Sequence, residues 1–301
     1  MKILLLGKNG QVGWELQRSL ATLGDVVALD RNSSCDLSGD LEDLEALTAT
    51  VRAVAPDVIV NAAAYTAVDK AQSEPALAAR VNADAPGVLA REAARLGAWL
   101  VHYSTDYVFD GSGDAARNED APTAPLSVYG RTKLEGELAI AASGARAVVL
   151  RTSWVYAARG QNFAKTMLRL AKERDELKVV ADQFGAPTGA ELIADVTAHI
   201  IRQIAQTHDA GHLAGTYHLA AAGETTWHAY AQFVLDHASK HGSTLKVQAS
   251  QVSPLRSEDY PVPATRPRNS RLELAKIEKT FKLKMPPWQQ GVQRMLDEIQ
   301  P

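Results

Sequence analysis

Tyr129 and Lys133 are separated by three residues, so a helix would place both side chains on one face, one turn apart. A phenol has a reference pKa of about 10, and a fixed cation beside it favours the phenolate and lowers that pKa towards the working range of an acid–base catalyst. The same spacing also occurs on solvated helices that have no catalytic role. The pair therefore predicts catalysis only if the rest of the chain provides a cofactor site and a substrate site.

The composition is that of an ordinary globular protein of 301 residues, a length that corresponds to about two domains. The net charge of −3, with both signs mixed, gives no basic field for nucleic acid and no polybasic membrane anchor. No apolar run approaches the roughly 20 residues that span a bilayer, and residues 2–6 are too short for a signal peptide. The single cysteine, Cys35, excludes an intramolecular disulfide and fits a reducing compartment. We expect a cytoplasmic protein that acts on small molecules.

A glycine-rich turn follows the first apolar run. Residues 2–6 have the pattern of a strand buried on both faces, and residues 14–23 have helical spacing. Strand, glycine turn and helix form the context in which a helix N-terminus binds phosphate groups. The sequence thus predicts a dinucleotide-binding turn made by Gly7, Asn9, Gly10, Gln11, Val12 and Gly13.

The end of the second strand bears on the choice of cofactor. Asp30 can accept hydrogen bonds from the adenosine ribose, which favours NADH, whereas Arg31 can pair with the 2′-phosphate of NADPH. The preference is therefore open. Asp40, followed by Leu41, is placed where an adenine amino group could bind, although a helix N-cap is an equally good interpretation of Asp40.

Two further strands end in residues that suit a ligand site. The strand at 56–60 leads into Ala62, Ala63 and Ala64, which leave room for a ligand against the backbone. The strand at 99–103 ends in Tyr103 and leads into hydroxyl-bearing residues at 104–105. Because parallel strands bind ligands at their carboxyl ends, these segments are expected to share one crevice with the glycine turn.

The order and spacing of these motifs resemble the extended short-chain dehydrogenase/reductase superfamily. Within it, residues 104–111, Ser-Thr-Asp-Tyr-Val-Phe-Asp-Gly, resemble the signature of dTDP-4-dehydrorhamnose reductases, and the resemblance covers essentially the whole chain. Sugar-nucleotide dehydratases carry a glutamate where this chain has Tyr107. The loss of that carboxylate removes the base required for elimination and favours simple carbonyl reduction.

The resemblance implies an α/β fold: a Rossmann-type doubly wound parallel sheet with a smaller C-terminal α/β substrate-binding domain. The expected division is a nucleotide-binding domain at 1–153, rejoined by about 188–210, and a substrate-binding domain at 154–187 and 211–301. An apolar face at four-residue spacing, from Leu192 to Ile204, predicts the helix that returns to the first domain.

The implied reaction is reduction of the C4 keto group of dTDP-4-dehydro-L-rhamnose by NADPH or NADH, a step in cell-surface polysaccharide precursor synthesis. Tyr129 would donate the proton, Lys133 would lower the pKa of Tyr129 and hold the nicotinamide ribose, and Thr105 would bind the carbonyl oxygen. The expected substrate-binding residues are Thr105, Asp106, Tyr107, Tyr129, Trp154 and Arg268.

Several assignments stay open on the sequence alone. Trp154 fits a core tryptophan as well as a sugar-stacking one, whereas the aromatic residues from Trp227 to Phe233 are interpreted as core. Some relatives use magnesium at a dimer contact, and Glu15, Glu191 and Glu298 occupy similar places, but such carboxylates are common on solvated helices. The resemblance allows a homodimer and bound Mg²⁺ as expectations, but the residues by themselves do not commit the chain to a metal.

Two alternative functions are consistent with the motifs. Thr105, Tyr129 and Lys133 specify a reaction and not a sugar, so a reductase or epimerase of another nucleotide sugar remains an alternative. A non-catalytic NADP-binding regulatory subunit is the alternative from another class. Such proteins tend to lose the tyrosine or the lysine, and this chain retains both.

Overall fold

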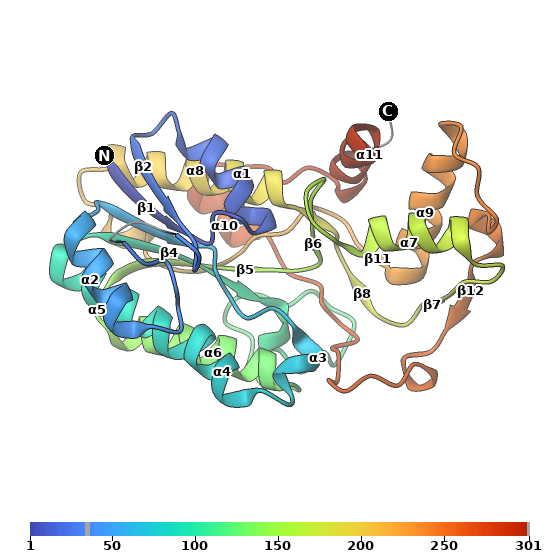
Figure 1. The fold of residues 1–301 in the computed structure, drawn as a ribbon, viewed down its shortest axis with the longest axis horizontal. Coiled ribbons are helices and arrows are strands. Elements are labelled where there is room, and N and C mark those ends of the chain that lie inside the picture. The colour runs from blue at the N-terminus through green and yellow to red at the C-terminus, as the bar shows by residue number, and fades with distance from the viewer. Residues whose placement is uncertain (34–36, 300–301) are drawn as a thin grey trace.

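A parallel sheet forms the centre of the larger part of the molecule (Figure 1). The computed structural model describes residues 1–33 and 37–299, so Cys35 lies outside the described residues. Across those residues the sheet has six strands, all parallel, in the order β2 (Asp25–Leu29), β1 (Lys2–Leu6), β3 (Val58–Asn61), β4 (Trp99–Thr105), β5 (Arg146–Thr152) and β10 (Gly215–His218). From β1 the chain adds β2 on one side of the sheet, and then β3, β4 and β5 on the other side. The crevice between the carboxyl ends of β1 and β3 is therefore the topological switch point, where doubly wound sheets bind ligands. The predicted Rossmann-type fold is confirmed.

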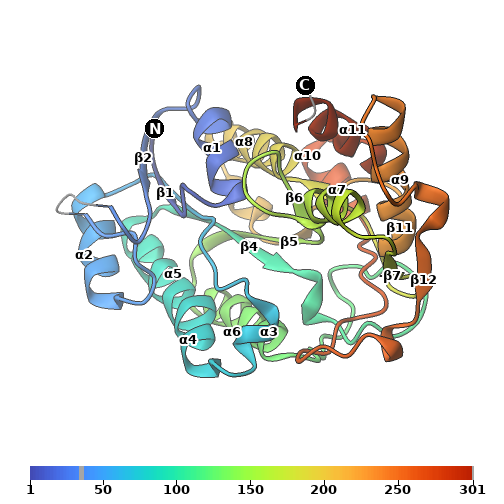
Figure 2. The same cartoon turned by 45° about the vertical axis from the view of Figure 1, so that its right-hand side comes forward.

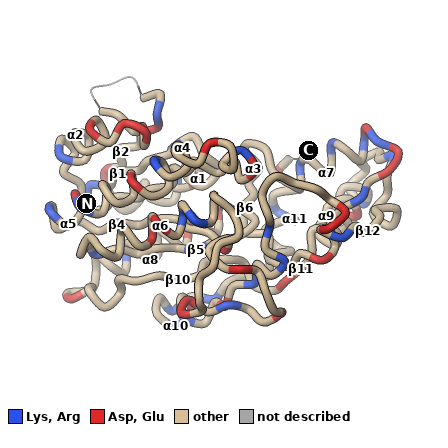
Figure 3. The backbone as a smooth tube through the Cα atoms, turned by 90° about the horizontal axis from the view of Figure 1, so that it is seen from below, with Lys and Arg blue, Asp and Glu red and all other residues tan. Residues whose placement is uncertain are grey.

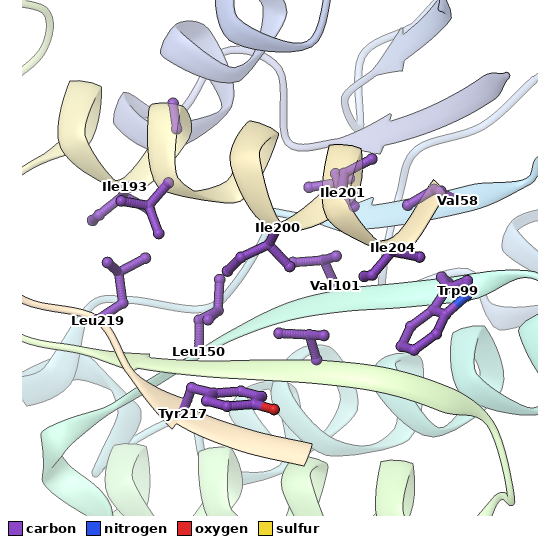
Figure 4. Packing of buried hydrophobic residues seen from close by; sticks show 14 of the residues in the cluster. Val58, Trp99, Val101, Leu150, Ile193, Ile200, Ile201, Ile204, Tyr217 and Leu219 are labelled. Atoms are coloured by element: carbon purple, nitrogen blue, oxygen red, sulfur yellow. The ribbon is translucent and has the colours of Figure 1, made fainter. Parts of the chain in front are cut away.

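Helices cover both faces of this sheet, as the continuous apolar strands require. One face packs against α2 (Leu44–Val54), α5 (Ala85–Leu96) and α6 (Val128–Ala142), and the other against α1 (Gln11–Leu20), α8 (Ala190–Gln206) and α10 (Ala275–Phe281). Figure 4 shows side chains of α8 packed over β4, β5 and β10. The helix predicted from the apolar spacing between Leu192 and Ile204 is therefore confirmed, and it packs on α1.

The last strand of the sheet comes from a segment that the sequence assigned to the other domain. Strand β10 pairs with β5 in parallel register, and Tyr217 is buried in the core that α8 and α10 cover. Residues 211–301 therefore include elements of the central sheet as well as of the smaller part. The sequence prediction missed this strand because β10 pairs with β5, which lies far away in the sequence, and local patterns do not show which strands pair. The exact division into domains stays a prediction.

The smaller part is built on a separate apolar cluster. It contains α7 (Phe163–Glu173), α9 (Trp227–Lys240) and α11 (Trp288–Ile299), and its strands form the pairs β6 (Val155–Tyr156) with β9 (Thr188–Gly189), β7 (Lys178–Val180) with β12 (Ser253–Leu255), and β8 (Phe184–Gly185) with β11 (Thr225–Thr226). Figures 1 and 2 place α7, α9 and β12 together, at the end of the molecule far from β2.

Short elements lie between the longer helices and strands. They are α3 (Val68–Ala71), α4 (Pro75–Ala79), a π-helical turn η1 (Arg80–Asp84) and the 3₁₀ turns η2 (Asp106–Val108), η3 (Ala210–Leu213), η4 (Ala249–Gln251) and η5 (Ser257–Asp259). Basic and acidic residues are interspersed along the chain (Figure 3), in agreement with the small net charge. In the described part of the chain, none of the helices combines the length and the apolar character that a bilayer crossing requires.

Candidate active site

A cavity of about 910 Å³ lies at the carboxyl edge of the sheet, where the structure brings together most of the residues predicted from the sequence. It is bounded by the glycine turn, the ends of β3 and β4, the start of α6 and parts of the smaller domain. Its size suits a small-molecule site. The predicted residues that line it are Gly7, Asn9, Gly10, Gln11, Val12, Asp30, Arg31, Asp40, Leu41, Ala62, Ala63, Ala64, Tyr103, Thr105, Asp106, Tyr107, Tyr129, Lys133 and Trp154.

Two predicted residues are not part of this lining. Gly13 is buried in α1, where a Cβ atom would overlap the carbonyl group of Gly7, so its role is to let the helix pack on the turn. Arg268 donates a hydrogen bond of 2.6 Å to Glu258, and its Nε lies 3.8 Å from Asp182. Because these carboxylates pair its guanidinium outside the cavity, the structure gives no support to Arg268 as a substrate-binding residue.

The start of α1 has the features of an anion site. Its N-cap residue is Gly10, which has no side chain that could cap the free amides, and the first turn contains no acidic residue. Gly7 has φ +86°, and a Cβ atom there would lie 2.7 Å from the backbone nitrogen of Ala63. The turn therefore leaves backbone N–H groups available to a phosphate and keeps the chain close to β3. These observations fit the pyrophosphate of a dinucleotide.

Gly7→Ala is expected to weaken NADPH binding by roughly tenfold or more, because a Cβ atom strains the left-handed backbone and displaces Ala63. Fluorescence titration of the purified protein with NADPH measures this change. Gly113→Ala is the matched control, since Gly113 has φ +70° and a Cβ atom there meets nothing within 4 Å. Equal effects of the two substitutions would contradict the role assigned to Gly7.

The adenosine end of the cavity contains an ionised carboxylate. Burial opposes ionisation of Asp30, but hydrogen bonds from Ser33 and the Asn32 amide outweigh it and lower the pKa of Asp30 below its usual value. Asn9 also donates to Asp30. Arg31 lies 3.7 Å from Glu42, so it already has an acidic neighbour. The geometry leaves both NADH and NADPH open.

Asp40 is not the N-cap of a helix. The N-cap of α2 is Asp43, whose side chain accepts a hydrogen bond from the amide of Ala46. Asp40 instead accepts one from the amide of Glu42, at 3.0 Å, and lines the cavity. The N-cap interpretation of Asp40 is therefore wrong, because the helix begins three residues later than its position requires.

Helix α6 carries the tyrosine and the lysine, and it begins at a capped turn. The side chain of Ser127 accepts a hydrogen bond from the amide of Gly130, which starts the helix just before Tyr129. Lys133 is buried, and its Nζ donates a 2.6 Å hydrogen bond to the carbonyl oxygen of Tyr103. Burial lowers the pKa of Lys133 to about 8, against the opposing charge of Glu137.

The expected effect of Lys133 on Tyr129 is not observed. Burial raises the pKa of Tyr129 to about 12; a hydrogen bond with Thr105 lowers it and the charge of Asp106 raises it further. The amine of Lys133 is held at Tyr103 and His102 instead of at the phenol. The prediction that Lys133 lowers this pKa is therefore wrong for the chain by itself. Tyr129 remains protonated across the physiological range.

Thr105 and Asp106 form a second hydrogen-bonded unit in the cavity. The hydroxyl of Thr105 donates a 3.1 Å hydrogen bond to Oδ1 of Asp106 and accepts one from the amide of Tyr107. Burial raises the pKa of Asp106 to about 6, and the neighbouring hydroxyls of Ser270 and Thr105 oppose this shift. Oδ2 of Asp106 is buried without a hydrogen-bond partner among the described residues. A polar group of a ligand would fit beside it.

Asp106→Asn is expected to flatten the pH dependence of stability. Between pH 3.8 and about 6, unfolded Asp106 loses its proton while folded Asp106 keeps it, so the free energy of unfolding falls as pH rises. Over that interval the loss is about 3 kcal/mol. The melting temperature of the variant relative to the wild type should therefore be higher at pH 7.5 than at pH 4.

A control with the opposite sign is available in Asp110. Hydrogen bonds from the backbone and side chain of Ser112 lower the pKa of Asp110 below its usual value. Asp110→Asn should accordingly lose stability at high pH relative to low pH. Differences of the same sign for both variants would contradict the burial assigned to Asp106.

A pair of stacked tryptophans closes the other end of the cavity. Trp154, with φ +49°, stacks on Trp227 with ring centroids 3.6 Å apart and planes at 15°. Trp227 packs against the apolar cluster of the smaller part, as the interpretation of it as a core residue expects, and it also lines the cavity with Trp154. It follows Thr226, the N-cap of α9, and therefore projects from the first turn of the helix. The sequence contains no local signal that brings this turn to Trp154.

Burial raises the pKa of Glu191, and the charges of Glu15 and Glu298 add to that rise, but in the part of the chain that the structure describes the carboxylates of these three glutamates are not grouped within 4.8 Å of one another. Among the described residues, the cluster of metal-ligating side chains with donor atoms within 4.8 Å of one another is His237, His241 and Asp297, on α9 and α11. The three glutamates are not part of it. The structure gives Mg²⁺ no support, and the homodimer stays a prediction.

Comparisons with known proteins identify the relatives of this chain. The family model described as the RmlD substrate binding domain matches residues 1–300. The dTDP-4-dehydrorhamnose reductase of Shigella flexneri is 55% identical over 299 residues, which cover 99% of this chain and 98% of that protein. The structure of a dTDP-4-dehydrorhamnose reductase from Clostridium acetobutylicum is similar, with a TM-score of 0.89, 35% identity and 100% coverage of both chains.

The reductase from Bacillus anthracis, solved in complex with NADP, has a TM-score of 0.86 and 33% identity to this chain, with 99% of both chains covered. These relatives and the family model extend over nearly the whole sequence, including both the sheet and the smaller part. The chain therefore belongs to the dTDP-4-dehydrorhamnose reductase family.

Proposed function

We propose that this protein reduces the C4 keto group of dTDP-4-dehydro-L-rhamnose to give dTDP-L-rhamnose, with NADPH as the reductant. The observation that carries the proposal is the placement of Thr105, Tyr129 and Lys133 in the same cavity as the glycine turn. The Shigella flexneri relative has this activity in its name, and the Bacillus anthracis relative binds NADP.

The cofactor fits the groups that the chain presents. The N-terminus of α1 and the glycine turn would hold the pyrophosphate, and Asp30 with Arg31 would contact the adenosine ribose or its phosphate. Ala62, Ala63 and Ala64 would let the cofactor lie close to the backbone. When bound, NADPH supplies the hydride that reduces the carbonyl carbon.

Tyr129 would donate its phenolic proton to the oxygen at C4 as negative charge develops there. The residue is protonated at neutral pH because burial keeps its pKa near 12. Thr105, whose hydroxyl donates to Asp106 in the free chain, would turn that proton to the same oxygen and stabilise the charge. Lys133 would bind the nicotinamide ribose. Tyr107, with its ring 5.6 Å from Tyr129 at an angle of 80°, occupies the place of the dehydratase glutamate.

The tryptophan pair would bind the remaining parts of the substrate. Trp154 and Trp227 offer aromatic surface at the wall of the cavity formed by the smaller part, where a sugar or thymine ring could pack. Asp106 would hydrogen-bond a sugar hydroxyl through its unpartnered Oδ2.

An assay of NADPH and NADH oxidation by the purified chain tests this function. A panel of dTDP-, GDP- and UDP-linked 4-keto sugars should show the highest kcat/KM for dTDP-4-dehydro-L-rhamnose with NADPH. Faster turnover of a sugar on another nucleotide would favour the alternative of a different nucleotide-sugar enzyme. Tight NADPH binding without turnover of any sugar would favour the regulatory alternative.

A further inference from the structure

His102 occupies a position in β4 where an apolar residue would satisfy the packing. Its side chain is only 1% exposed, and its neighbours in the sheet are Asn61 of β3 and Val149 of β5. Burial, and to a smaller degree the charge of Lys133, lowers the pKa of His102 well below its ordinary value, so the imidazole is neutral. A buried polar ring of this kind is costly unless its nitrogens are hydrogen-bonded.

Both ring nitrogens face polar groups. Nδ1 lies 3.2 Å from Nδ2 of Asn61, and Nε2 lies 3.3 Å from Nζ of Lys133. Oδ1 of Asn61 accepts a hydrogen bond from the amide of Ala63 in the cavity wall. His102 therefore links the lysine of α6 to the segment of chain that lines the dinucleotide site.

The direction of these hydrogen bonds determines where the imidazole carries its proton. Because Oδ1 of Asn61 already faces the Ala63 amide, its amide nitrogen faces His102, and Nδ1 must act as the acceptor. A neutral imidazole has one proton, which is then on Nε2 and points at Lys133. The N–H group at Nε2 can donate a hydrogen bond to the lone pair of a neutral Lys133 amine, whereas it would face an N–H group of the charged ammonium. It therefore favours the neutral form of Lys133.

We propose that His102 is a positioning residue for Lys133: it accepts from Asn61 at Nδ1, donates from Nε2 to the amine, and favours the uncharged form of Lys133 in the free enzyme. Burial already lowers the pKa of Lys133 to about 8, and the donor on His102 acts in the same direction, while Nζ donates a proton to the carbonyl oxygen of Tyr103. This inference rests on the proposed function of Lys133 in cofactor binding, and it adds a residue that controls the proton on that lysine.

Several other titratable or charged groups lie on the elements that surround His102 and Lys133 in the described part of the chain. From α6, Glu137 lies one turn beyond Lys133 and favours its charged form, but Glu137 is itself paired with Arg151 of β5 at 2.6 Å. Asp106 and Tyr129 lie on the cavity side. On α5, the carboxylate of Glu92 is paired with Arg52 of α2 and with Arg95 of α5. Strand β3 contributes the uncharged Asn61.

Nitrogen-15 NMR of the histidine side chains tests the proton position directly in the wild-type protein. The His102 signal, identified by its absence from the His102→Gln spectrum, should report an unprotonated Nδ1 and a protonated Nε2. A proton on Nδ1 would overturn the proposal. This measurement needs no turnover, so a failure of the proposed sugar reduction leaves it decisive.

The pH dependence of kcat/KM for NADPH tests the consequence, since this constant reports groups of the free enzyme. His102→Leu removes the donor and should move the alkaline limb, which follows Lys133, upward by roughly half to one pH unit. His102→Gln keeps a donor at the Nε2 position and should restore the wild-type limb. His218→Gln, the loss of another buried imidazole outside the cavity, should leave the limb in place.

Any of three results would overturn the role of His102: an unchanged limb in His102→Leu, a downward shift, or an equal shift in His102→Gln. If His102→Leu does not fold, the His102→Gln limb and the wild-type NMR spectrum still decide the question. A wild-type chain that binds NADPH but reduces no 4-keto sugar would reject the proposed function, and the NMR result would then stand by itself.

Discussion

Tyr129→Phe is expected to lower kcat by roughly 10²-fold or more while the affinity for NADPH changes little. The substitution removes only the phenolic oxygen, the group proposed to protonate the C4 oxygen. The ring and its edge contact with Tyr107 are retained, so the cavity keeps its shape. Steady-state kinetics with NADPH and dTDP-4-dehydro-L-rhamnose, together with a fluorescence titration of NADPH, separate the chemical step from binding.

A second tyrosine provides the control for this experiment. Tyr217 is buried in the core below α8, and its hydroxyl donates a hydrogen bond to the carbonyl oxygen of Leu213. Tyr217→Phe should lose a comparable hydrogen bond with no effect on kcat. Near wild-type turnover in Tyr129→Phe would reject the tyrosine as the proton donor, whatever the control shows.

Glu137→Gln is expected to lower the free energy of unfolding by roughly 3–5 kcal/mol, because it leaves a buried arginine without its counter-ion. The side chains of Glu137 and Arg151 are 7% and 6% exposed, and Nη2 of Arg151 lies 2.6 Å from the carboxylate. Arginine cannot shed its charge, so the charge remains buried. Urea denaturation followed by circular dichroism measures the change.

An exposed ion pair gives the comparison. Arg169 and Glu173 lie at a similar distance, 2.7 Å, but both side chains are more than half exposed. Glu173→Gln should therefore change stability by about 0–1 kcal/mol. Similar effects of the two glutamine substitutions would show that the Arg151–Glu137 pair does not behave as a buried one.

The same glutamate connects stability with catalysis. Glu137 favours the charged form of Lys133, and it packs one turn away from that lysine on α6. A buried pair that fixes α6 against β5 therefore also fixes the position of Tyr129 and Lys133 relative to the end of β4. The positions of Tyr129 and Lys133 thus depend on the contact between α6 and β5 as well as on their spacing in the sequence.

The sequence determined the features that depend on neighbouring residues. Apolar runs predicted the buried strands, and the glycines from Gly7 to Gly13 predicted the tight turn between a strand and a helix, because such a turn needs glycine locally. The carboxyl ends of β3 and β4 share one edge in any parallel sheet, so Ala63 and Thr105 could be placed in one crevice. The four-residue spacing of Tyr129 and Lys133 required only that α6 form.

Only the tertiary structure decided which side chains meet across the chain and how burial changes their chemistry. Trp227 reaches Trp154, β10 joins β5, and Arg268 is paired away from the cavity, all through contacts between segments distant in sequence. The proton affinities of Tyr129 and Lys133 follow burial and fixed hydrogen bonds, which spacing cannot reveal. Local pattern specifies the elements, whereas long-range packing sets the dielectric surroundings and the partners of each catalytic group.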